Sequence, residues 1–320
     1  MLHTPAELAA ALSLTVSKLR WLCYHTEAAT RVHYVQFEVP KKSGGTRTLS
    51  APHSTLAAAQ EWVLASILSK LPTEEPAHGF VPGRSTLTNA LPHAGKDVVV
   101  NVDLEQFFPS IGSPGSGTCT AGPATAGRWP RSPPCSAPEC PRRKRARGDA
   151  VLRGHRPAGL PQGASTSPAA SNQIARKLDR RVLALCKRLG FTYTRYADDL
   201  TFSAPPGHRE KVGYLLARVR HIAADEGFTL NPKKTRVQRP EARQSVTGLV
   251  VNAAPAVPQD VVRRLRAILH RAKAEGLAAQ NRDGHPDFRG WVEGMIAYVG
   301  MVKPAAAEPL KAALAALRPD

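Results

Sequence analysis

The stretch Tyr196-Ala-Asp-Asp-Leu-Thr-Phe-Ser203 places two adjacent acidic residues between aromatic and aliphatic ones. Neighbouring side chains of a strand point to opposite faces, so two adjacent carboxylates can serve one site only where the chain turns. We therefore predict two short strands over Thr192–Phe202, joined by a tight turn at Ala197-Asp198-Asp199. Aspartate pairs are also common in solvated turns. The apolar flanks indicate instead a turn near a core, where two acids need a cation.

A third acidic residue follows another predicted strand. Lys96–Val102 is nearly continuous in β-branched residues, which is typical of a buried central strand, and Asp103 comes directly after it. Three carboxylates that converge near a strand end can hold two Mg²⁺ ions, because Mg²⁺ prefers oxygen ligands. Two such ions, about 4 Å apart, activate an attacking hydroxyl and stabilise a leaving phosphate oxygen. Asp103, Asp198 and Asp199 are therefore the candidate catalytic, metal-binding residues.

Helices and strands surround these acids in a mixed order. The spacing of apolar residues predicts helices over Pro5 to about Trp21, Leu56–Leu71, Ser171–Leu189 and His208–Glu226. It predicts three more in the C-terminal part: from Gln259 through Leu269, around Trp291–Val299, and over Pro309–Leu317. Alternation predicts a strand over Val32–Val39. A second strand is predicted after the basic hairpin tip of Pro40–Leu49, and a further one over Val246–Asn252. This pattern indicates an α+β protein.

The composition favours a protein that binds nucleic acid. Lys and Arg number 44 against 25 Asp and Glu, which leaves a net charge of +19 and a pI near 10.2. A chain this basic usually meets a polyanion, and its 42% hydrophobic residues exclude wholesale disorder. It shows no apolar run near the length of a membrane span, no signal peptide at Met1–Glu7 and no metal-finger spacing among its five cysteines. We expect a cytoplasmic protein with no membrane contact.

One segment departs from this composition. Ser113–Ala158 holds eight of the 28 prolines, three of the five cysteines and almost no large aliphatic residues. Such a segment cannot bury enough apolar surface to offset its ordering entropy. Taken alone, it is best interpreted as a disordered basic insertion.

Five segments, in order, resemble the motifs of reverse transcriptases and together cover roughly residues 30–255. They are Val102–Ile111, Gly159–Pro168 with the following Asn172, Tyr196–Ser203, Gly227–Arg236 and Gln244–Asn252. The resemblance implies an α+β right-hand polymerase, with an antiparallel palm sheet and an α-helical thumb. It places an N-terminal helical region at 1–30, the fingers at 31–95, the palm at 96–252 and the thumb at 253–320.

The resemblance also implies a role for individual residues. Asp103, Asp198 and Asp199 would be ligands of two Mg²⁺ ions, with the Leu104 carbonyl as a further ligand. Four residues would act on the incoming deoxynucleoside triphosphate: Arg47 on its phosphates, Phe108 beneath its sugar, Gln162 on the nucleotide, and Lys234 as proton donor to pyrophosphate. The basic helical tail would grip a duplex.

Two shorter signatures are similar to those of bacterial retron reverse transcriptases. Asn89-Ala-Leu-Pro-His93 fits Asn-Ala-x-x-His, and Val246-Thr247-Gly248 fits Val-Thr-Gly. The resemblance implies that these segments help to recognise RNA, although a buried structural histidine is an alternative for His93. It further implies a cognate non-coding RNA as template and primer, multicopy single-stranded DNA as product, an effector protein as partner and a role in anti-phage defence.

Two alternatives remain at this point. One is a group II intron or diversity-generating reverse transcriptase, against which the two retron signatures argue. The other is a catalytically inactive RNA-binding remnant, which the aspartate triad disfavours and the anomalous segment favours. Template-dependent nucleotide incorporation separates this remnant from an active polymerase.

Codon degeneracy suggests an origin for the anomalous segment. In relatives this region is an apolar helix and a strand, and Ser113–Ala158 offers neither. Read one base later, codons for Arg131–Pro138 permit an apolar helix, and codons for Ala150–Pro157 permit a strand. We hypothesise a compensated pair of frameshifts, which the coding DNA would test. If the translation is correct as it stands, the palm lacks this support and we expect weak or absent polymerase activity.

Overall fold

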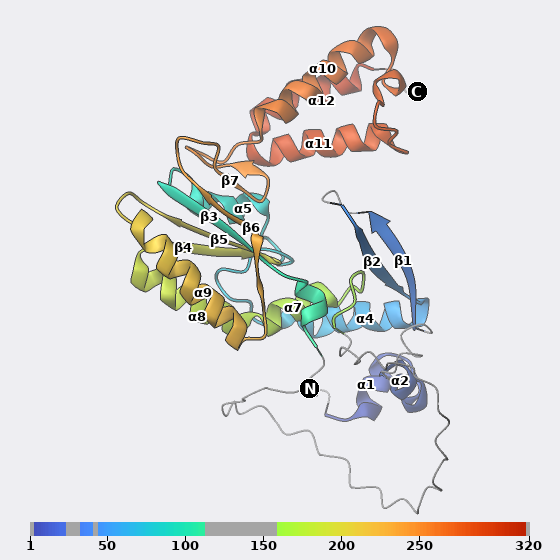
Figure 1. The fold of residues 1–320 in the computed structure, drawn as a ribbon. Helices are drawn as coiled ribbons and strands as arrows, with labels where there is room; N and C mark the ends of the chain where they lie inside the picture. Colours follow the sequence, from blue (N-terminus) through green and yellow to red (C-terminus); the bar gives the residue numbers. More distant parts are fainter. Residues whose placement is uncertain (1–2, 24–32, 41–43, 113–158, 318–320) are drawn as a thin grey trace, which may run out of the picture.

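The computed structural model describes residues 3–23, 33–40, 44–112 and 159–317. A four-stranded sheet lies at the centre, a two-stranded hairpin stands apart from it, and a helical bundle follows at the C-terminal end (Figure 1). Both the frameshift hypothesis and the predicted disorder concern Ser113–Ala158, which lies outside the described residues. The α+β class with antiparallel sheets is confirmed.

The central sheet has the strand order β4-β5-β3-β6, and every neighbouring pair is antiparallel. The strands are β3 (Val98–Leu104), β4 (Thr192–Tyr196), β5 (Asp199–Ala204) and β6 (Leu230–Gln238). The predicted buried strand is β3, which lies inside the sheet between β5 and β6. Sequence analysis did not predict β6, whose Pro232 and two lysines hide a strand pattern.

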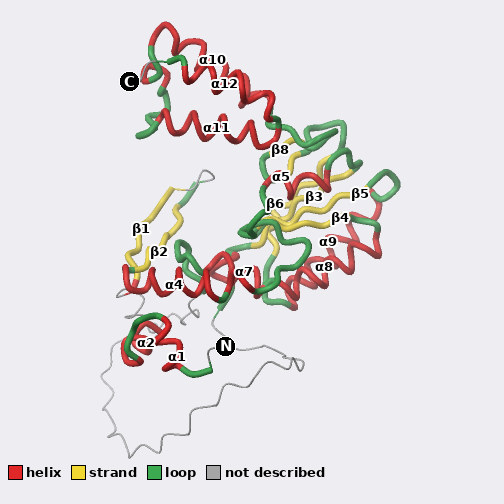
Figure 2. Tube along the Cα trace, turned by 180° about the vertical axis from the view of Figure 1, so that it is seen from behind, coloured by secondary structure: helices red, strands yellow, loops and turns green. Residues whose placement is uncertain are grey.

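Alternation along β3 separates the two faces of the sheet. Val98, Val100, Val102 and Leu104 belong to a core shared with α8 (Arg176–Leu189) and α9 (Val212–Asp225), which cover that face (Figure 2). Residues of the other parity, Val99, Asn101 and Asp103, point to the opposite face. Asp103 therefore sits on the face that these helices leave uncovered.

A second core joins the sheet to the C-terminal bundle. α10 (Gln259–Glu275), α11 (Phe288–Val302) and α12 (Pro304–Ala315) pack with Val99 of β3 and with α5 (Thr86–Ala90). Within the described ranges, no helix is both long and apolar enough to cross a membrane. The bundle is thus anchored to the sheet by apolar side chains.

The hairpin of β1 (Tyr34–Pro40) and β2 (Thr46–Pro52) forms where the alternation predicts it. α4 (Ser54–Ser66) follows it, and Gln60 on α4 donates a 2.9 Å hydrogen bond to the Tyr34 hydroxyl. The 3₁₀ and short helical turns of the described chain are η1 (Leu68–Lys70), η2 (Leu91–His93), α6 (Phe107–Ser110), η3 (Arg209–Lys211) and η4 (Ala278–Gln280).

Two predicted helices are each divided in the structure. The helix from Pro5 to Trp21 is wrong as a single element: α1 (Pro5–Ala11) ends before Ser13, whose φ of 54° breaks the helix, and α2 (Val16–Cys23) follows. The predicted helix Ser171–Leu189 is likewise α7 (Ser167–Ile174) and α8, separated at Ala175. Helical periodicity persists across both breaks, so the apolar pattern does not reveal them.

The predicted strand Val246–Asn252 is also wrong as one strand. β7 (Ser245–Val246) and β8 (Leu249–Val250) form a small hairpin whose turn is Thr247-Gly248. Both turn residues have positive φ, 45° and 86°, which matches the demand of a two-residue hairpin turn. A run of β-forming residues conceals this turn because Gly248 is its only local signal.

Candidate active site

The three predicted carboxylates meet where β3 ends and the antiparallel β5 begins. Asp103 and Asp199 are direct partners across the antiparallel pair, and Asp198 lies in the turn between β4 and β5. The Leu104 N–H donates a 2.9 Å hydrogen bond to the Asp198 carbonyl, which ties this turn to β3. The Leu104 side chain is buried, so only its backbone faces the triad.

Two residues of β6 approach the first of these acids. Lys234 Nζ lies 2.7 Å from Asp103 Oδ1, and Asn231 Nδ2 lies 3.4 Å from Asp103 Oδ2. The hydrogen bond to Asp103 raises the pKa of Lys234, so this ammonium stays charged at neutral pH. The structure therefore brings Lys234 to the triad, whereas sequence analysis did not single out Asn231.

The other two carboxylates are electrostatically strained. Burial raises the pKa of Asp198, and the like charge of Asp103 adds to this, while Lys234 and Arg47 act in the opposite direction. Asp199 still reaches solvent, but the protein atoms around it remove much of its hydration, and with Asp198 and Asp103 they raise its pKa to about 6. Crowded acids of this kind favour a bound cation.

The donor set fits a hard divalent cation. All three side chains offer carboxylate oxygens, and Asp198 and Asp199 repel each other until positive charge arrives between them. In the part of the chain that the structure describes, no three His, Cys, Asp or Glu side chains are already arranged around a metal position. Lys234 supplies the positive charge nearest to Asp103.

The β1–β2 hairpin carries Arg47 toward this site. Arg47 is exposed on β2, and its charge lowers the pKa of Asp198, which places it within electrostatic range of the triad. The Gln162 carbonyl accepts a 2.7 Å hydrogen bond from the Ser50 N–H, so the loop of Gln162 docks on the same strand. Gly163 has a φ of 116°, and a Cβ there would stand 2.9 Å from the Ser50 carbonyl oxygen.

Phe108 follows β3 in α6 and is half-buried. Its ring lies 5.5 Å from that of Phe107 and 6.2 Å from that of Phe80, measured between centroids. Phe107 is buried in the core, as expected for a packing residue. Phe108 thus packs between the rings of Phe80 and Phe107 at the margin of the core.

The retron signature residues lie in the interior. Asn89, His93 and Val246 are fully buried, and His93 lies within hydrogen-bonding distance of Ser203 (2.7 Å) and Thr194 (2.8 Å). Burial lowers the pKa of His93 to about 3. For His93 this burial fits the structural alternative, and a role of these residues in RNA recognition stays a prediction.

The Val246-Thr247-Gly248 turn instead joins two parts of the fold. Thr247 Oγ1 donates a 3.2 Å hydrogen bond to the Thr86 carbonyl on α5, and the Tyr298 hydroxyl on α11 donates a 3.3 Å hydrogen bond to the Gly248 carbonyl. These two hydrogen bonds tie the turn to α5 and to α11.

Sequence analysis missed a buried group beneath the carboxylate turn. Arg195 precedes Tyr196 and is 0% exposed, and it pairs with Asp179 of α8 at 2.7 Å. Two signals in the sequence point to this pair. Arg195 sits in a strand of otherwise apolar inward positions, and Asp179 shares the apolar face of its helix with Val182 and Cys186.

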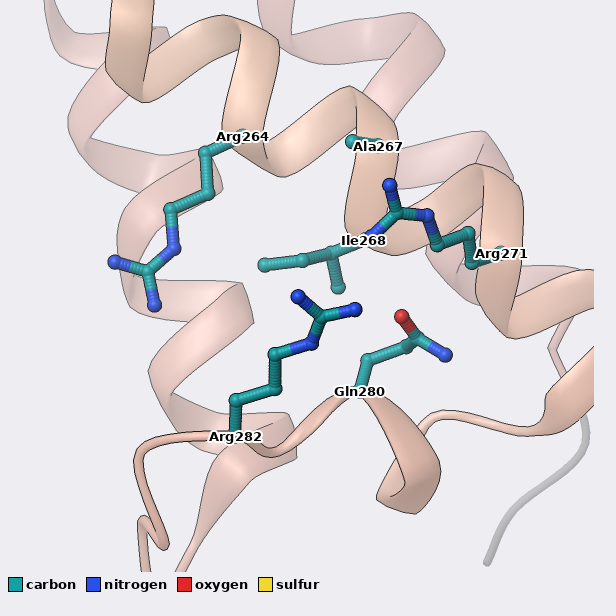
Figure 3. A pocket seen from close by; sticks show the side chains of 6 residues that line it. All are labelled: Arg264, Ala267, Ile268, Arg271, Gln280 and Arg282. Atoms are coloured by element: carbon teal, nitrogen blue, oxygen red, sulfur yellow. The ribbon is translucent and has the colours of Figure 1, made fainter.

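A basic pocket lies in the C-terminal bundle. Figure 3 shows its lining: Arg264, Ala267, Ile268 and Arg271 from α10, Gln280 from η4, and Arg282 from the loop that follows. The guanidinium groups of Arg271 and Arg282 point toward the same hollow beside Ile268 (Figure 3). Arg264 pairs with Asp283 and lies 5.4 Å from the Trp291 ring centroid. The pocket suits an anion.

Comparisons with known proteins agree with this geometry. The sequence profile of the family described as "Reverse transcriptase (RNA-dependent DNA polymerase)" matches residues 39–253. The Retron Mx162 and Mx65 reverse transcriptases of Myxococcus xanthus are 45% and 41% identical, over 95% and 96% of this chain and 65% and 70% of theirs. The Retron Ec86 reverse transcriptase of Escherichia coli is 32% identical, over 82% of this chain and 76% of its own.

These relatives decide between the retron interpretation and the group II intron or diversity-generating one. The chain spans 65% of the length of the Mx162 relative, so that protein is longer than the chain described here. The family profile covers residues 39–253 of this chain, and the Mx65 and Ec86 matches cover most of this chain and most of each relative. The chain belongs to the reverse transcriptase family, among the retron reverse transcriptases.

Proposed function

We propose that this chain is an RNA-directed DNA polymerase that copies a cognate structured RNA into DNA from deoxynucleoside triphosphates. The observation that carries the proposal is the pairing of Asp103 with Asp199 across β3 and β5, with Asp198 in the adjoining turn. Acids crowded at one strand end, with raised pKa values for two of them, are suited to binding cations that act on phosphate.

Asp103, Asp198 and Asp199 would hold two Mg²⁺ ions, with the Leu104 carbonyl as a further ligand. Bound there, the metal ions would neutralise charge on the attacking hydroxyl, the α-phosphate and the leaving pyrophosphate. The protein's own contribution is to hold the reactants in line, since phosphoryl transfer needs mostly positioning and charge neutralisation. The 2.7 Å contact between Lys234 and Asp103 supports Lys234 as the proton donor to pyrophosphate.

Three further residues would select and orient the nucleotide. Arg47 would grip the triphosphate with its planar guanidinium, which its exposure and its range to Asp198 support. Phe108 would exclude a 2′-hydroxyl by bulk. Gln162 would contact the nucleotide from the loop that docks on β2.

The proposed names for the regions follow these roles. The β1–β2 hairpin and α4 are the fingers, the central sheet with α8 and α9 is the palm, and α10–α12 form the thumb. The pocket of Arg264, Arg271 and Arg282 would hold a phosphate of the nucleic-acid backbone, a contact that does not depend on sequence. The net charge of +19 supports a polyanionic partner.

The resemblance to retron reverse transcriptases carries the finer proposals. We propose that a non-coding RNA serves as template and primer, that the product is multicopy single-stranded DNA, and that the system acts in the cytoplasm against phage, with an effector protein as a further partner. The anomalous segment bears on this activity because it lies between α6, which carries Phe108, and the loop that carries Gln162. An isolated antiparallel bridge joins Gly112 to Gly159, so the two ends of the segment lie side by side.

The test is primer extension on an RNA template by the full chain with Mg²⁺, beside the double variant Asp198→Asn/Asp199→Asn. Incorporation by the wild type that falls at least about 1,000-fold in the double variant would support the proposal, because charge stabilisation is the main catalytic contribution. A circular dichroism melt of both proteins checks that the variant is folded.

Two other outcomes have distinct meanings. Incorporation that survives in the double variant would overturn the assignment of the triad. An inactive wild type that still binds RNA would favour the inactive RNA-binding remnant. A chain carrying the reframed segment in place of Ser113–Ala158 would then show whether that segment is responsible.

A further inference from the structure

A fully buried ionic group lies directly beneath the carboxylate turn. Arg195 Nε donates a 2.8 Å hydrogen bond to Asp179 Oδ1, and its Nη2 donates a 2.7 Å hydrogen bond to Asp179 Oδ2. Both side chains are almost entirely removed from water, at 0% and 1% exposure. The Tyr193 hydroxyl donates a further 2.9 Å bond to the same carboxylate. This two-pronged arrangement leaves the guanidinium little freedom to rotate.

The remaining hydrogen bonds of the Arg195 guanidinium go to the carboxylate turn and to Asn172 of α7. Nη1 donates a 2.9 Å hydrogen bond to the Ala197 carbonyl, and Nη2 lies 3.1 Å from Asn172 Oδ1. Ala197 is the residue before Asp198, and its φ of 57° lies in the left-handed region. That conformation costs an alanine about 1 kcal/mol, so the turn needs support from outside itself.

The turn is also held from its other side. Asn172 Nδ2 donates a 2.8 Å hydrogen bond to the Gly79 carbonyl. A Cβ on Gly79 would stand 2.5 Å from the Ala197 nitrogen, so the segment of Gly79 presses directly on the turn. The strand carrying Arg195 is bonded to the same segment, because Arg195 N–H donates to the Pro76 carbonyl and His78 N–H to the Arg195 carbonyl, both at 2.7 Å.

A buried ion pair is a weak source of stability compared with apolar residues of the same volume. The Arg195–Asp179 pair therefore calls for a reason other than stability, and its contacts supply one. The guanidinium connects Asn172 of α7 and Asp179 of α8 to the Ala197 carbonyl, which directly precedes the two acidic residues. Through Asn172 it is also linked to the Gly79 segment.

We propose that Arg195 is a positioning residue whose guanidinium, oriented by Asp179 and Asn172, fixes the Ala197 carbonyl and thereby the placement of Asp198 and Asp199. The proposal rests on the proposed function, because it assigns the support of the same metal-binding turn. Groups that orient metal ligands typically change metal affinity or activity by about 10- to 100-fold when removed.

The main test is the double variant Arg195→Met/Asp179→Leu in the full chain. It replaces the ion pair by apolar side chains of similar volume, so the core stays filled while the hydrogen bond to the Ala197 carbonyl is lost. Three quantities are measured: the melting temperature, the affinity for Mn²⁺ by paramagnetic resonance without nucleic acid, and kcat and KM for a deoxynucleoside triphosphate.

We expect a melting temperature near that of the wild type, a Mn²⁺ affinity about 10- to 100-fold weaker, and a kcat lower by a similar factor with KM little changed. The matched control is Arg181→Met. Arg181 lies on the same helix as Asp179 but pairs at the surface with Asp225 and Glu226, so its loss should leave Mn²⁺ affinity and kcat unchanged.

A folded double variant with wild-type Mn²⁺ affinity and kcat would overturn the proposal. Should that variant not fold, Asn172→Ala takes its place, because it removes one hold on the guanidinium and keeps the ion pair. It should weaken Mn²⁺ binding in the same direction, and wild-type behaviour would overturn the proposal equally.

The metal measurement separates this proposal from the proposed function. A wild type that binds Mn²⁺ but incorporates no nucleotide contradicts the polymerase assignment, while the comparison of Mn²⁺ affinities still decides the role of Arg195. A wild type that binds no Mn²⁺ leaves Arg195 with no metal site to position and overturns the proposal as well.

Discussion

Two β-hairpins contribute charged residues to the candidate site, and they are built in opposite ways. In the β4–β5 hairpin the strands are largely buried, and Arg195 and Asp179 support the turn from within. In the β1–β2 hairpin almost every β1 residue is exposed, with Val35 at 52% and Phe37 at 48%. The two carboxylates proposed to share metal ions lie on the buried hairpin, whereas the arginine proposed to meet an incoming nucleotide lies on the exposed one.

This difference follows from the physics of each task. Carboxylates that share metal ions need fixed spacing, and burial with hydrogen bonds to the backbone supplies it. An arginine that grips phosphates needs access from solvent and tolerates motion, because the ligand itself orders it. The predictions below test this contrast, from the largest expected effect to the smallest.

Breaking the support of the buried hairpin should have the largest effect on stability. Asp179→Ala leaves Arg195 buried and without its carboxylate, and we expect a loss of about 3–5 kcal/mol in the free energy of unfolding, measured by urea denaturation. The matched control is Asp283→Ala, which removes an exposed partner of Arg264 and should cost less than about 1 kcal/mol. Equal losses in the two variants would contradict the contrast.

Removing the charge of the exposed hairpin should affect activity and leave stability alone. Arg47→Gln should lower kcat/KM for the nucleotide about 10- to 100-fold, because a hydrogen bond to a charged group contributes about 1.5–3 kcal/mol. The free energy of unfolding should stay within about 0.5 kcal/mol, as is usual for surface substitutions. The kcat/KM of Arg47→Lys should lie between those of the wild type and Arg47→Gln, because lysine keeps the charge and loses the planar fork.

The buried hairpin should also show a pH dependence through His93, which contacts Ser203 on β5 and Thr194 on β4. Burial lowers the pKa of His93 from 6.5 to about 3. The unfolded chain therefore takes up a proton that the folded chain excludes, and stability falls as the pH drops below 6.5, by up to about 1.4 kcal/mol per pH unit.

Asp199 acts in the opposite sense over part of this range. Its pKa is raised from 3.8 to about 6 in the folded state, so its contribution to stability increases as the pH falls between these values. The comparison that isolates His93 is the slope of unfolding free energy against pH in the wild type and in His93→Gln. An unchanged slope in the variant would show that His93 is not the group responsible.

The smallest effect should come from outside both hairpins. Arg271→Gln/Arg282→Gln should weaken binding of an RNA–DNA duplex several-fold and reduce the slope of log K against log salt by about 2, one for each phosphate contact. Fluorescence anisotropy at several salt concentrations measures both quantities. Arg263→Gln, on the same helix but outside the pocket, is the control and should change the slope less.

Several features of the fold follow from local sequence patterns alone. The apolar alternation around Ala197-Asp198-Asp199 predicted β4, the turn and β5, and the β-branched run before Asp103 predicted β3. The predicted helix ends at Leu189 and Glu226 are each followed by a glycine, and both Gly190 and Gly227 have the positive φ of a helix end. The helix breaks at Ser13 and Ala175 escaped prediction because helical periodicity continues through them.

Residue types and their order indicated the three aspartates of the site, and the resemblance to reverse transcriptases implied Lys234 and Arg47. Asp103, Asp198, Asp199, Lys234 and Arg47 were predicted to share one site, and the structure brings the first four together with Arg47 within electrostatic range. The role of Asn89, His93 and Val246 in RNA recognition stays a prediction, and their burial could not be predicted because signature letters do not reveal whether a side chain is buried.

The sequence by itself thus determined β3, β4, β5, the turn between β4 and β5 and the identity of the acidic residues, since propensity and alternation act between neighbours in the chain. Only the tertiary structure decided that Asp103 stands opposite Asp199, that Lys234 reaches Asp103, and that Arg195 finds Asp179 beneath the turn. Each of these partnerships joins residues of different helices or strands. Their geometry is set by packing across the core and by the need to pair every buried charge, which no local pattern encodes.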